Sequence, residues 1–158
     1  MDGETFDEQD PVKLYVPKRE RCEQFTVDAH APIGVFDSGI GGLTVVRELM
    51  RQIPDERMVY FGDTARLPYG AKSRDTIIRF SRQIVRFLKT KGVKAIVIAC
   101  NTASSHALKT LAEENDIPVI GVIYAGALSA VRATKNGRIG VIGTRGTVNS
   151  EIYPKVIQ

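Results

Sequence analysis

The sequence contains no tryptophan, and only two cysteines and two histidines occur among its 158 residues. Cys22 lies in a polar segment and Cys100 follows an apolar one. These unlike contexts argue against a structural disulfide. The chain also has no CxxC or HxxxH spacing, so it lacks the ligand cluster of a structural zinc site, and we predict no metal.

Long apolar runs are also missing. No segment approaches the roughly 18 residues that a membrane-spanning helix requires, and the N-terminus is acidic where a signal peptide would be basic and then apolar. We therefore expect a cytoplasmic protein with no membrane attachment. Its hydrophobic fraction of 43% and charged fraction of 25% are typical of a folded globular protein, and its length suits one compact domain.

Charge is unevenly distributed along the chain. Residues 1–31 hold eight acidic and four basic residues and show no sustained period of 2 or 3.6, so we interpret them as a polar N-terminal extension. The other 10 acidic and 18 basic residues give residues 32–158 a net charge of +8. This charge favours an anionic partner. Because the basic residues are scattered, without interleaved aromatic residues, we do not expect nucleic acid, whereas a small dicarboxylate fits.

From residue 32 onward, short apolar segments alternate with longer amphipathic ones, which predicts a doubly wound α/β fold with a parallel sheet. The expected strands cover residues 33–36, 58–61, 95–99, 119–122 and 139–142. The expected helices cover about 43–53, 74–91 between a Ser73 cap and Gly92, 102–114, 125–134 and 147–158. The last helix still presents apolar residues at its end and has no C-cap signal, so we expect the fold to continue beyond it.

Polar and reactive side chains follow the expected strands. In a doubly wound sheet, ligands bind beyond the carboxyl ends of the strands, where helix N-termini present free N–H groups. A thiol at such a place can act as a base or nucleophile, although a buried structural cysteine is about as common. The residues at these places are Asp37, Ser38, Asp63, Cys100, Asn101, Thr102, Thr144 and Thr147.

The glycine-rich segment DSGIGG at residues 37–42 raises the alternative of a dinucleotide site. The GxGxxG pattern would require glycine where Thr44 stands, and Asp37 would repel phosphate, so we disfavour this alternative. A P-loop is excluded because no GKS or GKT follows. Asp37 and Asp63 can each orient a thiol or simply form a turn. His106 lies about one turn into its helix, and we assign it no role.

Four segments together resemble the glutamate racemase family of the aspartate/glutamate racemase superfamily: VFDSGIGGL at 35–43, FGDTARLPYG at 61–70, IVIACNTASS at 96–105 and GTRGTV at 143–148. The resemblance runs from about Pro32 to the C-terminus. It implies two similar α/β lobes with the active site between them. Residues 32–122 would then form the first lobe, and residues 123–158 would begin a second lobe that is incomplete here.

The resemblance implies interconversion of L- and D-glutamate by cysteine thiols, without pyridoxal phosphate, flavin or metal. Cys100 matches the thiol that moves the proton on one face of glutamate, Asp37 a carboxylate next to it, and Asp63 a further acidic group. The family's second cysteine lies in a Gly-Cys-Thr-His motif beyond residue 158, and the surroundings of Cys22 do not match that motif. The implied substrate-binding positions are Asp37, Ser38, Tyr69, Gly70, Asn101, Thr102, Thr144 and Thr147.

The chemistry of such a reaction suits the strand-end residues. The α-proton of an amino acid is far less acidic than any side chain, so its removal needs a poised thiolate and donors that stabilise the charge growing on the carboxylate. Two alternatives stay open: a non-catalytic regulatory module, such as family members that bind DNA gyrase, and a racemase of aspartate or another small acid. An incomplete second lobe also predicts a homo-oligomer.

Overall fold

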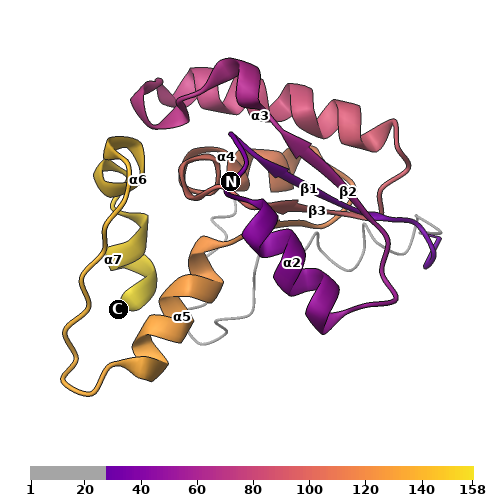
Figure 1. The fold of residues 1–158 in the computed structure, drawn as a ribbon. Coiled ribbons are helices and arrows are strands. Elements are labelled where there is room, and N and C mark those ends of the chain that lie inside the picture. Colours follow the sequence, from indigo (N-terminus) through magenta and orange to yellow (C-terminus); the bar gives the residue numbers. More distant parts are fainter. Residues whose placement is uncertain (1–27) are drawn as a thin grey trace, which may run out of the picture.

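The structure, a computed structural model, describes residues 28–158. The predicted extension lies mostly outside the described residues, and so does Cys22. A four-stranded parallel sheet with the order β2-β1-β3-β4 forms the centre of the fold (Figure 1). This arrangement confirms the predicted α/β class. The strands are β1 (Ile33–Asp37), β2 (Met58–Gly62), β3 (Ala95–Ile98) and β4 (Val119–Gly121).

Helices cover both faces of this sheet. Helix α2 lies on one face, whereas α3 and α4 lie on the other (Figure 1). Alternation along β1 explains the two layers, because Val35 packs with α2 and its neighbour Phe36 packs with α3 and α4. Both faces of the sheet are therefore covered by helices, as is usual for parallel sheets. These helices are α2 (Leu43–Gln52), α3 (Arg74–Lys89) and α4 (Asn101–Glu114).

The larger core lies between the sheet and the helices α3 and α4. Its fully buried side chains include Ile77, Leu88 and Leu111, and each such side chain contributes about 1.5–3 kcal/mol through its removal from water. The predicted N-cap of α3 is confirmed, whereas the helix ends at Lys89 with Thr90 as its C-cap, before the predicted Gly92. Ser73 Oγ accepts the Thr76 N–H at 3.3 Å, and Gly92, just beyond the helix, has a positive φ of 67° that favours glycine.

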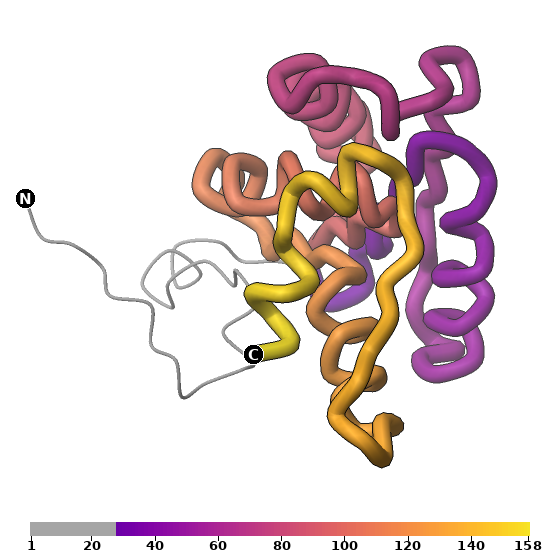
Figure 2. Tube along the Cα trace, turned by 90° about the vertical axis from the view of Figure 1, so that its left-hand side faces the viewer, coloured from indigo at the N-terminus to yellow at the C-terminus, as the bar shows by residue number. Residues whose placement is uncertain are grey.

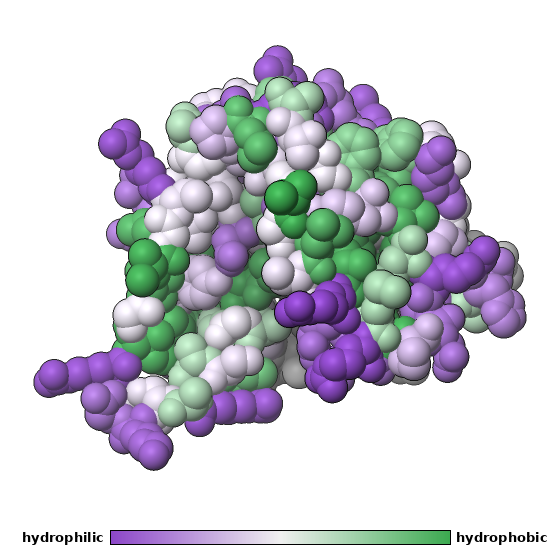
Figure 3. Space-filling view, viewed as in Figure 1, coloured by the Kyte–Doolittle hydropathy of each residue, from purple (hydrophilic) through white to green (hydrophobic). Residues whose placement is uncertain are grey.

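The C-terminal residues form a separate group of helices beside the sheet: α5 (Ile123–Ala133), α6 (Arg145–Asn149) and α7 (Ile152–Ile157). Figures 1 and 2 both show α7 next to α5, with a long irregular segment leading from α5 up to α6. Hydrophilic side chains gather at the tip of that segment, and apolar side chains reach the surface above it (Figure 3). Within residues 28–158 no helix is long and apolar enough to cross a membrane.

Two predictions for this region are wrong. Residues 139–142 form no strand, and Ile142 is fully exposed. A strand needs a hydrogen-bonded neighbour, and no described strand pairs with this segment. The single helix predicted from Thr147 is instead divided into α6 and α7. Glu151 between them has a positive φ of 54°, and such a left-handed residue interrupts a right-handed helix.

Candidate active site

Two of the three predicted catalytic residues, Asp37 and Cys100, lie where the direction of chain winding changes, whereas Asp63 follows the edge strand β2. β1 and β3 are neighbours in the sheet, but β1 leads to α2 on one face and β3 leads to α4 on the other. A crevice opens at the carboxyl ends of two such strands, and ligands of doubly wound proteins bind there. Asp37 and Ser38 come from the end of β1 and Cys100 from the end of β3. The fold therefore brings them together across 62 positions of sequence.

Cys100 is the N-cap residue of α4. Its sulfur accepts the Ala103 N–H at 3.4 Å, and the thiol donates to Ser38 Oγ, also at 3.4 Å. The side chain is only 7% exposed. Amide donors and the dipole at a helix N-terminus stabilise negative charge on sulfur. The position therefore suits a thiol that exchanges a proton with a ligand bound at this edge of the sheet.

The Asp37 carboxylate holds the glycine-rich loop in place. It accepts N–H groups from Ser38 at 2.7 Å and from Gly42 at 2.8 Å. Gly42 fits closely there, because an added Cβ would lie only 2.7 Å from the Asp37 Cβ. The link from Asp37 to the sulfur passes through the Ser38 hydroxyl, which lies 3.4 Å from Asp37 Oδ1. Asp37 thus serves the turn, and it orients the hydroxyl that meets Cys100.

Asp63 and Tyr69 form a buried pair beside this loop. The Tyr69 hydroxyl donates to Asp63 Oδ2, and Arg66 Nε donates to Oδ1 at 2.9 Å. Burial, together with the bond to the Asp63 carboxylate, raises the pKa of Tyr69. The Asp63 N–H donates to the Asp37 carbonyl at 2.9 Å, which ties the pair to β1. Because the Tyr69 hydroxyl donates its proton to Asp63, its oxygen can still accept a hydrogen bond, for example from an ammonium group, but it cannot donate to a carboxylate unless the bond to Asp63 breaks.

Three threonine hydroxyls meet beside the start of α4. Thr102 Oγ1 lies 2.9 Å from Thr144 Oγ1 and 3.3 Å from Thr147 Oγ1, and the last two lie 3.1 Å apart. Gly70 packs against this group, since an added Cβ would lie 2.5 Å from the Thr144 Cβ. Four predicted substrate-binding residues from three segments are therefore adjacent. The hydroxyls of this threonine cluster (Thr102, Thr144 and Thr147) bond to one another, so a hydroxyl must turn away from the cluster to donate to a carboxylate.

Asn101 lies at the first position of α4, next to Cys100. Its Oδ1 accepts a hydrogen bond from the Tyr153 hydroxyl of α7 at 2.7 Å. Sequence reasoning did not identify Tyr153 as a member of the site. Tyr153 lies seven residues after Gly146, and nothing in the sequence there indicates this contact, because the contact depends on how α7 packs.

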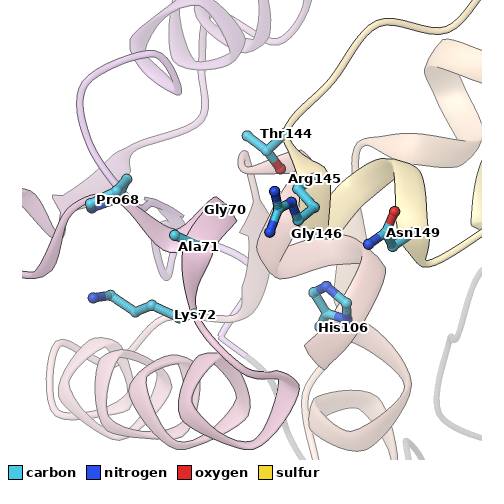
Figure 4. A pocket seen from close by; sticks show the side chains of 9 residues that line it. All are labelled: Pro68, Gly70, Ala71, Lys72, His106, Thr144, Arg145, Gly146 and Asn149. Carbon is cyan, nitrogen blue, oxygen red and sulfur yellow. The ribbon is translucent and has the colours of Figure 1, made fainter.

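A cavity of about 580 Å³ adjoins the predicted site. It shares Gly70 and Thr144 with that site, but Cys100 does not line it. His106, which was assigned no role, borders the cavity opposite Lys72 (Figure 4), and burial lowers the pKa of its imidazole. Its spacing of four residues from Thr102 could have placed it on the same helix face. The lining residues are Pro68, Gly70, Ala71, Lys72, His106, Thr144, Arg145, Gly146 and Asn149.

Among residues 28–158, no three His, Cys, Asp or Glu side chains come together in the manner of a metal site. The candidate donors are instead hydroxyl, amide and thiol groups. Such groups suit a small polar anion held by hydrogen bonds.

Comparison with known proteins shows which family this chain belongs to. Residues 33–158 match the model of the family described as Asp/Glu/Hydantoin racemase. A glutamate racemase of Oceanobacillus iheyensis is 54% identical over 126 residues, which is 80% of this chain and 46% of the relative. The chain therefore spans about half the length of the curated relatives it matches.

Solved structures give the same result. A glutamate racemase isoform from Bacillus anthracis has a TM-score of 0.80 at 50% identity, over 82% of this chain and 49% of the other. A glutamate racemase from Francisella tularensis, solved in complex with D-glutamate, has a TM-score of 0.71 at 50% identity, over 81% of this chain and 48% of the other.

Proposed function

The chain belongs to the Asp/Glu/Hydantoin racemase family, and on that premise we propose that it carries the first half of a glutamate racemase active site, an isomerase site without a cofactor. In this half-site, Cys100 moves the α-proton on one face of glutamate. The observation that carries the proposal is the placement of the Cys100 sulfur at the start of α4, in contact with Ser38 at the carboxyl ends of β1 and β3.

The proposed step transfers one proton. The Cys100 thiolate takes the α-proton, so that the C–H bond breaks and an S–H bond forms, while the electron pair moves towards the α-carboxylate. Hydrogen-bond donors must stabilise the charge that grows there. We assign this task to Asn101 together with the threonine cluster, whose hydroxyls reorient towards the carboxylates of glutamate, and we assign to Ser38, whose proton is directed to Asp37, the contact with Cys100.

Inversion requires a second acid on the opposite face of the α-carbon. Cys100 is the free cysteine of the described residues, so we assign residues 28–158 one face of the substrate only. The predicted roles of Asp37 and Asp63 stay part of this proposal. Asp37 acts by orienting Ser38. Asp63 acts by holding Tyr69, and with it the adjacent Gly70, in position.

The proposal also has a cellular setting. Two carboxylates make glutamate a suitable ligand for residues 32–158, whose net charge is +8. D-Glutamate is a precursor of peptidoglycan, so we place the reaction in a bacterial cytoplasm. The expected homo-oligomer stays a prediction, and no observation favours a gyrase-binding module over the enzyme.

Protection of Cys100 from alkylation tests the proposed ligand. In a Cys22→Ser chain, iodoacetamide labels Cys100 alone, and we expect glutamate to slow this labelling in a saturable manner because the ligand covers the sulfur. Aspartate, which is one methylene shorter, should protect only at higher concentrations. A labelling rate that glutamate does not change would refute the proposal, and stronger protection by aspartate would reassign the substrate.

A further inference from the structure

The hydroxyl of Tyr153 connects the C-terminal helices to the residue that follows the proposed catalytic thiol. It donates to Asn101 Oδ1 at 2.7 Å, across 52 positions of sequence. Asn101 is the first residue of α4, and Tyr153 lies in α7. This hydrogen bond therefore joins α7 directly to the start of the helix that carries Cys100.

The packing around α7 holds this hydroxyl in position. The left-handed residue Glu151 turns the chain between α6 and α7, and α7 then packs beside α5 (Figures 1 and 2). A Cβ added at Gly126 of α5 would lie 3.6 Å from the Tyr153 hydroxyl oxygen, so α5 borders the hydroxyl on one side. Ser150 Oγ also donates to the Thr147 carbonyl at 2.6 Å, which secures the end of α6.

The consequence concerns the orientation of a side-chain amide. A carboxamide presents an acceptor oxygen on one side and an NH₂ donor on the other. Because Tyr153 occupies the oxygen of Asn101, the Nδ2 group is directed away from Tyr153, and no described residue accepts a hydrogen bond from it. If the amide rotated by half a turn, its oxygen would face a carboxylate and repel it.

We propose that Tyr153 is a positioning residue, which fixes the Asn101 carboxamide so that its NH₂ group faces a carboxylate of the substrate. This inference rests on the proposed function for the identity of that carboxylate. The contact between Tyr153 and Asn101 does not depend on it, so the two can be tested separately.

The first test measures ligand binding in the Cys22→Ser chain. Tyr153→Phe removes only the hydroxyl, and we expect the glutamate concentration that half-protects Cys100 to rise about 2- to 10-fold, the usual effect of one hydrogen bond. Tyr124→Phe is the matched control, because the Tyr124 hydroxyl is buried without a partner among the described residues. In that variant, glutamate should half-protect Cys100 at the same concentration as in the parent chain.

A double variant shows whether Tyr153 acts through Asn101. In an Asn101→Ala background, Tyr153→Phe should have no further effect, since the amide to be positioned is gone. An equal loss in both backgrounds would overturn the inference, because it would indicate general damage to α7. A Tyr153→Phe chain that binds glutamate as tightly as the parent chain would also overturn the inference.

The second test needs no ligand. The Asn101 side-chain NH₂ signals, identified in nitrogen-15 NMR spectra by their loss in Asn101→Ala, should shift in Tyr153→Phe and stay in place in Tyr124→Phe. Unchanged signals in Tyr153→Phe would overturn the positioning role. If these signals shift but glutamate never protects Cys100 in the parent chain, the proposed function fails and the contact between Tyr153 and Asn101 stands.

Discussion

Replacing Gly70 by alanine should disrupt the contact between the loop after β2 and helix α6. The new Cβ would lie 2.5 Å from the Thr144 Cβ and 2.8 Å from its Cγ2, far inside van der Waals contact. Gly70 has no positive φ, so its backbone tolerates alanine and the clash is the dominant effect. Thr144 must move, and its hydrogen bonds to Thr102 and to the Thr147 N–H must lengthen or break.

The expected cost follows from these contacts. Overpacking costs about 1–3 kcal/mol, and the loss of one hydroxyl hydrogen bond adds about 1 kcal/mol. The smaller entropy of an unfolded chain with alanine offsets about 0.4–1 kcal/mol. We therefore expect Gly70→Ala to lower the free energy of unfolding by about 1–3.6 kcal/mol.

Urea unfolding followed by circular dichroism measures this change. The double variant Gly70→Ala/Thr144→Gly removes the obstructing Cβ, and it should recover more than half of the loss because glycine is a tolerable N-cap residue. Gly140→Ala is the matched control: an added Cβ there meets nothing within 4 Å. If Gly70→Ala unfolds at the same urea concentration as the parent chain, or if Thr144→Gly recovers nothing, the proposed clash is not what couples these segments.

Three further variants test the packing and the charges of the fold. Leu111→Ala should lower the free energy of unfolding by about 2–5 kcal/mol, because Leu111 is fully buried in the main core; a loss below 1 kcal/mol in urea would contradict this packing. Ser81→Ala should leave that free energy unchanged or raise it by about 1 kcal/mol, since the buried hydroxyl has no partner among the described residues, and a clear loss would indicate a partner. The hydrogen bond from Lys89 lowers the pKa of Asp116 below its ordinary 3.8. The ionised carboxylate of Asp116 therefore stabilises the fold above pH 3.8, and this stabilisation is lost as the pH falls through the lowered pKa. Asp116→Asn should thus cost less than about 1 kcal/mol at pH 7, as solvent screens this pair, and the difference from the parent chain should shrink as the pH is lowered below 3.8; a difference that does not shrink would contradict the assignment.

Local sequence patterns predicted the strands and the residues at their ends. Short apolar segments define β1 to β4, and parallel strands place their carboxyl ends at one edge of the sheet. That topology was enough to predict that Asp37 and Cys100 approach each other. The separate contributions of Ser38 to the thiol and of Asp37 to the turn could not be predicted, because they depend on side-chain rotamers within the loop.

Contacts that depend on how the C-terminal helices pack were beyond sequence reasoning. The bond between Tyr153 and Asn101 and the contact of Thr102 with Thr144 each join segments more than 40 residues apart, and no local period encodes them. The wrong strand at 139–142 has a related cause. Apolar residues indicate that a segment can form a strand, whereas the hydrogen-bonding partner that makes it one must come from elsewhere in the fold.

The most direct test of the central claim is incubation of the chain with each enantiomer of glutamate in D₂O, with the α-proton followed by NMR and the optical rotation recorded in parallel. We predict that one enantiomer exchanges its α-proton for deuterium without inversion, and that Cys100→Ser abolishes this exchange while Cys22→Ser retains it. Exchange that persists in Cys100→Ser would contradict the role of Cys100 as the base on one face. So would the absence of exchange for both enantiomers, if glutamate protects Cys100 from alkylation in the same chain.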